Sequence, residues 1–299
     1  MKHLPFSLFI YLESLLTLVG AFLPQNSLAQ NPEWAKIAAV QESLARAQTE
    51  ENRLALHDQL QTLWVEALST GHAFDVDWSE WNNAVVDLGQ DDERLVVFTW
   101  NVELDDRTQR YGGWIAMASS ANDLGYEFVM LSHDRDMDPQ DSGRIHRHDK
   151  WQGGLYYDGV LTRDHKNPVY TLLAWDGADA LTTRKWVETV EPRNGRLRFG
   201  APRFNTPEGL LKRVVLTYAD AVQTTLRYEK GEKRIVFDHL APDNPSFKGQ
   251  FAFYGPTLNY DGLEWRKGRW HFSPDIQVQN KDDSSPRDYL DPARRGRQR

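Results

Sequence analysis

The alternation of hydrophobic and polar positions is clearest between Leu211 and Leu240 of this chain of 299 residues. Three runs in this stretch look like strands, and they are Lys212–Ala219, Val222–Glu229 and Arg234–Leu240. In the middle run the less polar side chains occupy every second position, which places the two sets on opposite faces of a sheet. The pattern therefore predicts an antiparallel meander with one face toward solvent.

Strand-like segments rich in β-branched and aromatic residues continue on both sides of this stretch. They are Arg94–Val102, Gly113–Ala118, Tyr126–Leu131, Trp151–Val160, Val169–Trp175, Lys185–Val190, Leu197–Phe204, Leu258–Trp265 and Arg269–Phe272. Roughly a dozen short strands with frequent Gly, Pro and Asp-Gly turns favour an antiparallel fold. We therefore predict a mainly β (α+β) protein with a large antiparallel sandwich or barrel over residues 72–280, and a partial β-propeller as the alternative.

The periodicity before this β region is helical. The segment Asn31–Glu33 has the residues of a helix start, and apolar side chains then recur at helical spacing from Trp34 to Ala67 before Gly71. A polar stretch interrupts the pattern midway. Over residues 30–71 the sequence predicts one long helix or a helical hairpin, whose apolar stripe packs on the sheet.

The N-terminus has the features of a secretory signal peptide. A basic start precedes the apolar run Leu4–Leu23, and small residues at Ser27 and Ala29 suit a cleavage site before Gln30. A carboxylate at Glu13 would cost roughly 2.5–3.5 kcal/mol inside a bilayer, which argues against a stable membrane span. We expect residues 1–29 to be removed and the protein to reach the periplasm or the extracellular space; a retained anchor is the alternative.

Composition excludes several classes of function. The formal net charge of −8 argues against wholesale binding of nucleic acid. The chain has no Cys, which excludes disulfides, thiolate nucleophiles, Cys-zinc sites and a lipid anchor on a cysteine. The 11 Trp residues are expected to supply core more than platforms for sugar stacking. The polar stretch 281–299 has a basic end and is expected to be disordered.

Several blocks of the sequence resemble a family of exported proteins that is frequent in Bacteroidetes-type bacteria. The blocks are VVFTWNVELDD, WQGGLYYD, YTLLAWDGADALTTRKWVETV, FGAPRF, KRVVLTYADAVQTTLRY, RIVFDHLAP, and YGPTLNYDGLEW with GRWHF. They lie between Phe74 and Phe272, which is most of the mature chain. The resemblance implies an exported, β-rich protein. The family has no known activity, so the resemblance transfers no catalytic residue.

A polar loop over Ser132–Lys150 is the first candidate for chemistry. Its possible metal ligands are His133, Asp134, Asp136, Asp138, His146 and His148. The aspartates have the spacing of a calcium loop, but Pro139 replaces the turn glycine and Ile145 the closing glutamate, which excludes an EF-hand. The histidines could hold Zn²⁺ or Cu²⁺. The favoured interpretation is a solvated loop, and we predict no cofactor, with weak binding of a divalent metal as the alternative.

Carboxylates at predicted strand ends are the second candidate, and they are Asp176, Asp238 and Asp261. Two of them within about 5–10 Å would permit glycoside hydrolysis. Neighbouring residues of a strand face opposite ways, so His239 would need a partner other than Asp238, such as Asp176 or Asp261. Tryptophans that could line such a site are Trp175 and Trp265. The favoured interpretation is that the aspartates cap turns and the histidine bonds a carbonyl.

An aromatic-Asp-Gly triplet occurs three times. The triplets are Tyr157-Asp158-Gly159, Trp175-Asp176-Gly177 and Tyr260-Asp261-Gly262. We expect each to form a turn at a strand end. The run Asp261–Trp265 is similar to the core of an Asp-box, a hairpin turn of sialidase-type propellers, and supports a β-hairpin there without implying an activity.

The sequence contains no Gly-x-Ser-x-Gly, Walker, dinucleotide or His-Glu-x-x-His motif. It therefore favours a non-catalytic binding or structural β domain of the cell envelope, with a glycan or an envelope protein as its partner. A carbohydrate-active or other hydrolase that uses the strand-end carboxylates is one alternative. A protein that binds a divalent metal through the polar loop is the other.

Overall fold

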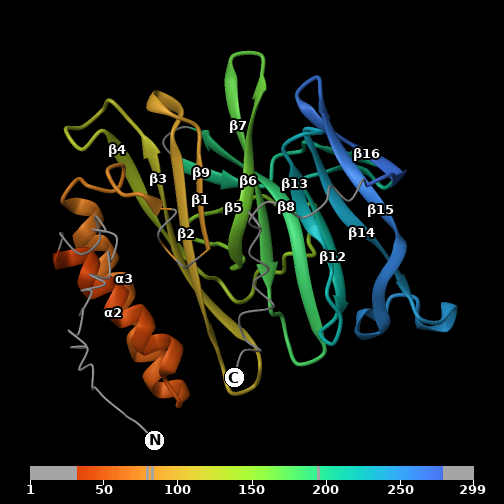
Figure 1. Ribbon diagram of the computed structural model, residues 1–299, viewed down its shortest axis with the longest axis horizontal. Coiled ribbons are helices and arrows are strands. Elements are labelled where there is room, and N and C mark those ends of the chain that lie inside the picture. The colour runs from red at the N-terminus through yellow and green to blue at the C-terminus, as the bar shows by residue number, and fades with distance from the viewer. Residues whose placement is uncertain (1–31, 79–80, 82–83, 194–195, 279–299) are drawn as a thin grey trace, which may run out of the picture.

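The structure is a computed structural model that describes residues 32–78, 81, 84–193 and 196–278. The predicted signal peptide and the predicted disordered tail lie outside the described residues. Four layers follow one another across the molecule, first a pair of helices and then three β-sheets (Figure 1). The described residues form no closed barrel, and the mainly β fold predicted from the sequence is confirmed.

The first layer is a helical hairpin, one of the two arrangements that the periodicity allowed. Helix α2 (Pro32–Arg46) and helix α3 (Glu50–Ser69) pack side by side. The Thr49 side chain caps α3 by accepting a hydrogen bond from the backbone N–H of Asn52, at 3.3 Å. Trp64 of α3 is fully buried, so the apolar stripe of the hairpin covers the first sheet as predicted.

The first sheet has the antiparallel order β1-β2-β3-β4. Its strands are β1 (Ala84–Leu88), β2 (Leu95–Glu103), β3 (Gln109–Ala118) and β4 (Tyr126–Ser132), and a short 3₁₀ helix, η2 (Asp91–Glu93), joins the first two. Phe98 of β2 packs toward the helices and Val97 toward the next sheet, and both are fully buried. Because both faces are covered, the sequence of β2 reads as a nearly continuous apolar run.

The middle and last sheets complete the stack. The middle sheet has the order β5-β9-β8-β7-β6, and its strands are β5 (His146–Arg147), β6 (Leu155–Asp164), β7 (Asn167–Asp176), β8 (Thr182–Arg193) and β9 (Arg196–Phe199), with β12 (Arg213–Ala219) also paired to β8. The last sheet has the order β11-β10-β16-β15-β14-β13, and its strands are β10 (Phe204–Thr206), β11 (Gly209–Leu211), β13 (Leu226–Glu229), β14 (Arg234–Pro242), β15 (Tyr254–Arg266) and β16 (Arg269–Ile276). Two 3₁₀ helices, η3 (Pro245–Phe247) and η4 (Phe251–Phe253), lie between β14 and β15. A separate apolar core fills each gap between neighbouring layers.

The predicted meander is wrong in its first strand. Strand β12 pairs with β8 of the middle sheet, whereas β13 and β14 belong to the last sheet. The second run is also shorter than predicted, because β13 begins only at Leu226. Just before it, the carbonyl of Thr224 accepts a hydrogen bond from the buried Lys185 ammonium at 2.6 Å, which takes this carbonyl out of the strand ladder.

The predicted strand Leu197–Phe204 is also wrong, because it is two strands in two sheets. Strand β9 ends at Phe199 and β10 begins at Phe204. Between them Gly200 has φ +83°, and a Cβ there would lie 2.8 Å from the Arg213 guanidinium. A glycine at this point lets the chain leave the middle sheet for the last one.

Two of the three aromatic-Asp-Gly triplets do not form turns, which corrects the prediction from sequence. Asp158 lies inside β6 and Asp261 inside β15, and the strand register shifts beside both. These are β-bulges, in which an extra residue disturbs the ladder and re-aims a side chain. The hairpin expected around Asp261 is therefore absent, because β15 runs on to Arg266. Trp175-Asp176 does lie at a strand end, that of β7.

A buried carboxylate holds the centre of the middle sheet. Glu188 of β8 forms a salt bridge with Arg213 of β12 at 3.0 Å, and both side chains are fully buried. The other oxygen of Glu188 accepts three hydrogen bonds, from Gln152 (2.6 Å), Tyr156 (2.8 Å) and Trp186 (2.9 Å). Burial raises the pKa of Tyr156 well above its ordinary value, so the phenol remains a donor. Protein donors therefore satisfy both oxygens of Glu188.

The same salt bridge anchors the polar loop that precedes β6. The Arg213 guanidinium donates hydrogen bonds to the carbonyls of Asp141 (2.8 Å) and Arg144 (3.1 Å). His146 in the same loop contacts Gln152, the amide that donates to Glu188. The loop over Ser132–Lys150 is therefore tied to the core through its backbone.

Candidate functional site

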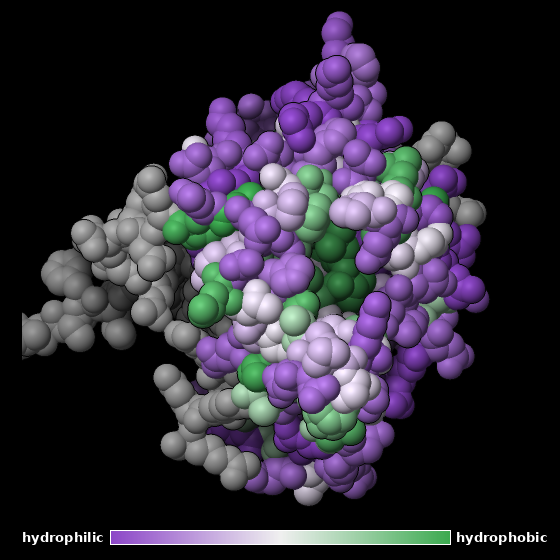
Figure 2. All heavy atoms as spheres, turned by 90° about the vertical axis from the view of Figure 1, so that its right-hand side faces the viewer, coloured by the Kyte–Doolittle hydropathy of each residue, from purple (hydrophilic) through white to green (hydrophobic). Residues whose placement is uncertain are grey.

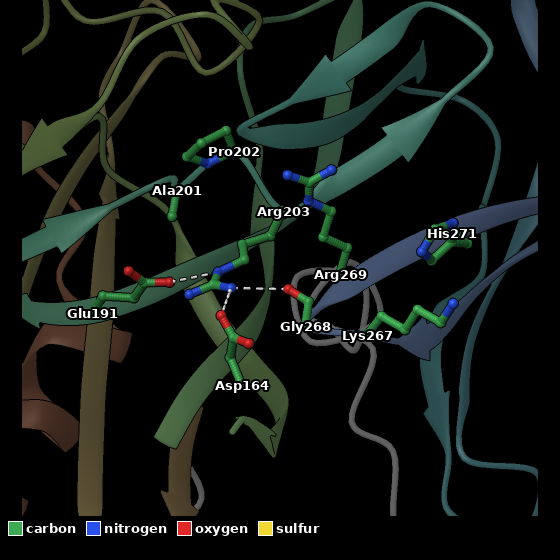
Figure 3. A pocket seen from close by; sticks show the side chains of 9 residues that line it. All are labelled: Asp164, Glu191, Ala201, Pro202, Arg203, Lys267, Gly268, Arg269 and His271. Carbon is green, nitrogen blue, oxygen red and sulfur yellow. Dashed lines mark hydrogen bonds and ion pairs between the residues drawn. The ribbon is translucent and has the colours of Figure 1, made fainter. Parts of the chain in front are cut away.

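An open cavity of about 520 Å³ lies where strands of the middle and last sheets meet (Figure 3). Its titratable lining residues are Asp164, Glu191, Arg203, Lys267, Arg269 and His271. They come from the end of β6, from β8, from the connection between β9 and β10, and from the β15–β16 hairpin. Ligand sites are usually concave and hold a few placed polar groups that orient the ligand, and this cavity is concave with charged groups in most of its lining.

The hairpin turn beside the cavity is set by its sequence. Lys267 and Gly268 have φ values of 51° and 75°, as a two-residue type I′ turn between antiparallel strands requires. Gly268 also packs against the neighbouring β6–β7 hairpin, because a Cβ on it would lie 2.5 Å from the carboxylate of Asp164. Glycine favours this approach because it has no Cβ to displace the Asp164 carboxylate and adopts the positive φ without strain, and the approach brings the two hairpins together.

Arg203 joins the parts of the cavity. Its guanidinium donates hydrogen bonds to Asp164 (2.6 Å), to Glu191 (2.9 Å) and to the carbonyl of Gly268 (2.9 Å), as Figure 3 shows. The bond from Arg203 lowers the pKa of Asp164 below its ordinary value, so this carboxyl stays ionised. The three charged side chains together carry one net negative charge and form a rigid floor.

The rim of the cavity is cationic. Lys267 and Arg269 are exposed, and within the described part of the chain neither forms a salt bridge. His271 Nδ1 lies 3.2 Å from the side-chain amide nitrogen of Asn205 and accepts its hydrogen bond, which places the ring proton on Nε2. Figure 3 shows the Lys267 side chain extending past His271 and the Arg269 side chain extending in another direction, toward Pro202, so the two cations lie on different sides of the rim. With the floor included, the cavity carries one net positive charge in a chain whose net charge is −8.

The sequence did not single out any residue of this cavity as a site. Arg203 lies in the FGAPRF block, and His271 in the GRWHF block, and both blocks were interpreted as strands. One signal was present, because Arg266, Lys267 and Arg269 place three cations around the glycine of a hairpin. Nothing local shows that Asp164 and Glu191 meet this hairpin.

Of the residues that the sequence did single out, His239 and Asp261 contact each other. His239 Nδ1 lies 2.8 Å from Asp261, whose other oxygen accepts a hydrogen bond from the backbone N–H of Asp275. The Asp261 side chain is 6% exposed and that of His239 is 52% exposed. Both residues occupy β-bulges, and Asp275 beside them has φ 51°, so three neighbouring strands are irregular here.

The other two strand-end carboxylates have separate partners. Asp176 lies between the first and middle sheets, where it accepts hydrogen bonds from the Tyr111 hydroxyl (2.7 Å) and from Arg184 (3.3 Å). Asp238 accepts a hydrogen bond from the backbone N–H of Thr225. Burial raises the pKa of both carboxyls. Among the described residues, Asp176 and Asp238 share no hydrogen-bond partner with each other.

The two candidate tryptophans are turned into the protein. Trp265 donates a hydrogen bond to the carbonyl of Arg163 at 3.1 Å and packs edge-to-face on Trp270. Trp175 packs on the core between the first and middle sheets. Neither lines the cavity at the hairpin tips.

The candidate metal ligands are dispersed over the polar loop. His133 accepts a hydrogen bond from the backbone of Tyr111 at 3.1 Å, and burial lowers its pKa to about 4. Burial also lowers the pKa of His146, while Asp138 pairs with Arg184 at 3.6 Å. In the described part of the chain, no group of three or more His, Asp or Glu side chains is arranged to hold a metal ion.

Comparisons with known proteins found no match to any family model, to any curated protein or to any solved structure. The helices among the described residues were also searched for membrane spans, and none has the length and the apolar character to cross a bilayer.

Proposed function

We propose that this chain is an exported, non-catalytic β domain that binds an anionic group of its ligand in the cavity at the hairpin tips. The observation that carries the proposal is the pair of exposed cations, Lys267 and Arg269, without a salt bridge in the described part of the chain. Export is an expectation from the N-terminal sequence and supports an envelope ligand. The cavity supports binding without a chemical step.

The hydrogen bonds of Arg203 preorganise the site before a ligand binds. Arg203 fixes Asp164, Glu191 and the turn carbonyl of Gly268, so the hairpin that carries the cations is held in place. An anion would receive charge-assisted hydrogen bonds from Lys267 and Arg269, each contributing about 1.5–3 kcal/mol before ordering costs. For a small anion this corresponds to a dissociation constant of order 1 mM.

The first prediction concerns the two cations of the rim. Titration calorimetry of the mature protein with inorganic phosphate should show binding, and the double variant Lys267→Ala/Arg269→Ala should bind at least 10-fold more weakly. The matched control is Lys36→Ala/Lys248→Ala, which removes two exposed cations elsewhere and should bind as the wild type does. Equal binding by all three proteins, or no binding by any, would show that the cavity is not an anion site.

A second function, hydrolysis, is supported by the hydrogen bond between His239 and Asp261. A buried carboxylate holds one ring nitrogen, and the half-exposed ring presents the other to solvent, where it can take a proton from an attacking water. The described contacts supply the base and the group that orients it.

The second prediction tests this function. His239→Gln should lower the rate of p-nitrophenyl acetate hydrolysis at least 10-fold, because the oriented base is lost. The chain offers a matched control in His72, which contacts Asp75 at 3.1 Å where the carboxylate is 75% exposed. His72→Gln should leave the rate unchanged. If His239→Gln and His72→Gln hydrolyse the ester equally fast, His239 is not a hydrolytic base.

A further inference from the structure

The positive rim of the cavity extends over a second hairpin. His165 and Lys166 form the tip of the β6–β7 hairpin, directly after Asp164, and both are exposed. The close approach of Gly268 to Asp164 places this tip against the β15–β16 turn. In Figure 1 the two hairpins reach the same end of the molecule. Lys166 therefore lies two residues from Asp164, a lining residue of the cavity, on the hairpin that packs against Gly268.

The floor of the cavity discriminates between kinds of anionic ligand. Asp164 and Glu191 are partly exposed, with side-chain exposures of 31% and 21%, and each bonds Arg203 through one oxygen. The second oxygen of Glu191 can accept a hydrogen bond from a hydroxyl group, whereas the second oxygen of Asp164 also lies 3.8 Å from His165 Nε2 and beside Gly268. The same carboxylates repel a ligand with several adjacent anionic groups, because the repulsion in a partly buried site grows with each added group. The lining therefore suits a molecule that has hydroxyls and a few separated anionic groups.

Aromatic stacking contributes nothing at this cavity. The two tryptophans of the hairpin, Trp265 and Trp270, pack on each other and belong to the core between the middle and last sheets. Figure 3 shows the side chains that line the cavity, and none of them is aromatic apart from the ring of His271. A neutral sugar chain would lack both a stacking platform and a partner for the cations.

We propose that the ligand is an acidic oligosaccharide whose sugars carry carboxylates. This inference rests on the proposed anion-binding function and names its ligand class. One carboxylate binds Lys267 and Arg269, and a sugar hydroxyl donates to Glu191. A second carboxylate, farther along the chain, reaches Lys166. The cations of the rim favour a ligand with carboxylates, and the carboxylates of the floor favour a ligand with hydroxyl groups.

Titration calorimetry of the mature protein with four probes tests the proposal. The probes are tetragalacturonate, its methyl ester, monomeric galacturonate and tripolyphosphate. We expect tetragalacturonate to bind at least 10-fold more tightly than the monomer and than tripolyphosphate, and the methyl ester to show no binding. Lys166→Ala should weaken the binding of tetragalacturonate at least threefold and leave the binding of monomeric galacturonate unchanged. Lys267→Ala/Arg269→Ala should weaken the binding of the tetramer and of the monomer at least 10-fold each.

The outcomes separate this inference from the function on which it rests. If the monomer binds in the cavity but the tetramer binds no more tightly, the site takes single anions, and the inference alone fails. If tripolyphosphate binds more tightly than the tetramer, the ligand is a densely charged anion, and the inference again fails. If no probe binds and inorganic phosphate does not bind either, the proposed anion site itself is wrong.

Discussion

Replacement of Glu188 by alanine should lower the free energy of unfolding by about 3–5 kcal/mol, because it leaves the fully buried guanidinium of Arg213 without its counter-charge. Three further donors, on Gln152, Tyr156 and Trp186, lose their acceptor at the same time. The midpoint of thermal unfolding should fall by roughly 10 °C. Urea unfolding followed by tryptophan fluorescence measures the change.

A double-mutant cycle measures the interaction energy of Glu188 with Arg213 apart from the contacts that each makes with other residues. In the Glu188→Leu background, Arg213→Met should cost much less than it does in the wild type, because the guanidinium no longer has a buried partner to lose. The control is Glu264→Ala, which removes an exposed carboxylate 4.0 Å from Arg266 and should change stability by about 0.5 kcal/mol or less. Additive effects of the two core substitutions would contradict the account of this network.

The protein should lose stability as the pH falls from about 6.5 to 4, because His57 is buried in its neutral form. Trp100 donates a hydrogen bond to His57 Nδ1 at 3.0 Å, and burial lowers the pKa of His57 to about 4. The unfolded state takes up its proton near pH 6.5, so the contribution is fully present above that pH and is lost on the way down to pH 4. One pKa unit corresponds to about 1.4 kcal/mol, which gives a loss of about 3 kcal/mol.

His133 and His146 should also lower the stability of the folded protein as the pH falls, because burial lowers the pKa of both rings. Urea unfolding at a series of pH values measures the slope. His57→Gln keeps an acceptor for Trp100 but does not take up a proton, so its stability should depend less steeply on pH. His72→Gln changes an exposed ring and should follow the wild type. A His57→Gln curve parallel to that of the wild type would contradict this account.

The sequence predicts the positions of the strands more reliably than it predicts which strands pair with each other. The alternation in Arg213–Ala219 and in Arg234–Pro242 identifies strands in both places, yet the first joins the middle sheet and the second the last. The period of two reports that a side chain faces a core, and two of the three cores of this protein flank the middle sheet. The choice between them depends on contacts such as that of Lys185 with Thr224, which no local pattern contains.

The candidate sites were also hard to predict from sequence wherever they join residues that are far apart along the chain. The pairing of His239 with Asp261 was among the possibilities that strand geometry allowed, because the two residues lie near the ends of neighbouring strand segments. The cavity was not foreseen, because Asp164, Glu191 and Lys267 come from three strand ends that are far apart in the sequence. Turn chemistry explains the Lys267-Gly268 hairpin, but the approach of Gly268 to Asp164 follows only from how the two sheets stack.

The most direct test of the anion site is to map its occupancy residue by residue. Amide chemical shifts of the isotope-labelled protein, followed during a titration with inorganic phosphate, report where the anion binds. The account predicts saturable shifts at Arg203, Lys267, Gly268 and His271, which are absent in Lys267→Ala/Arg269→Ala. Shifts that are centred on other elements, or that do not saturate, would contradict it.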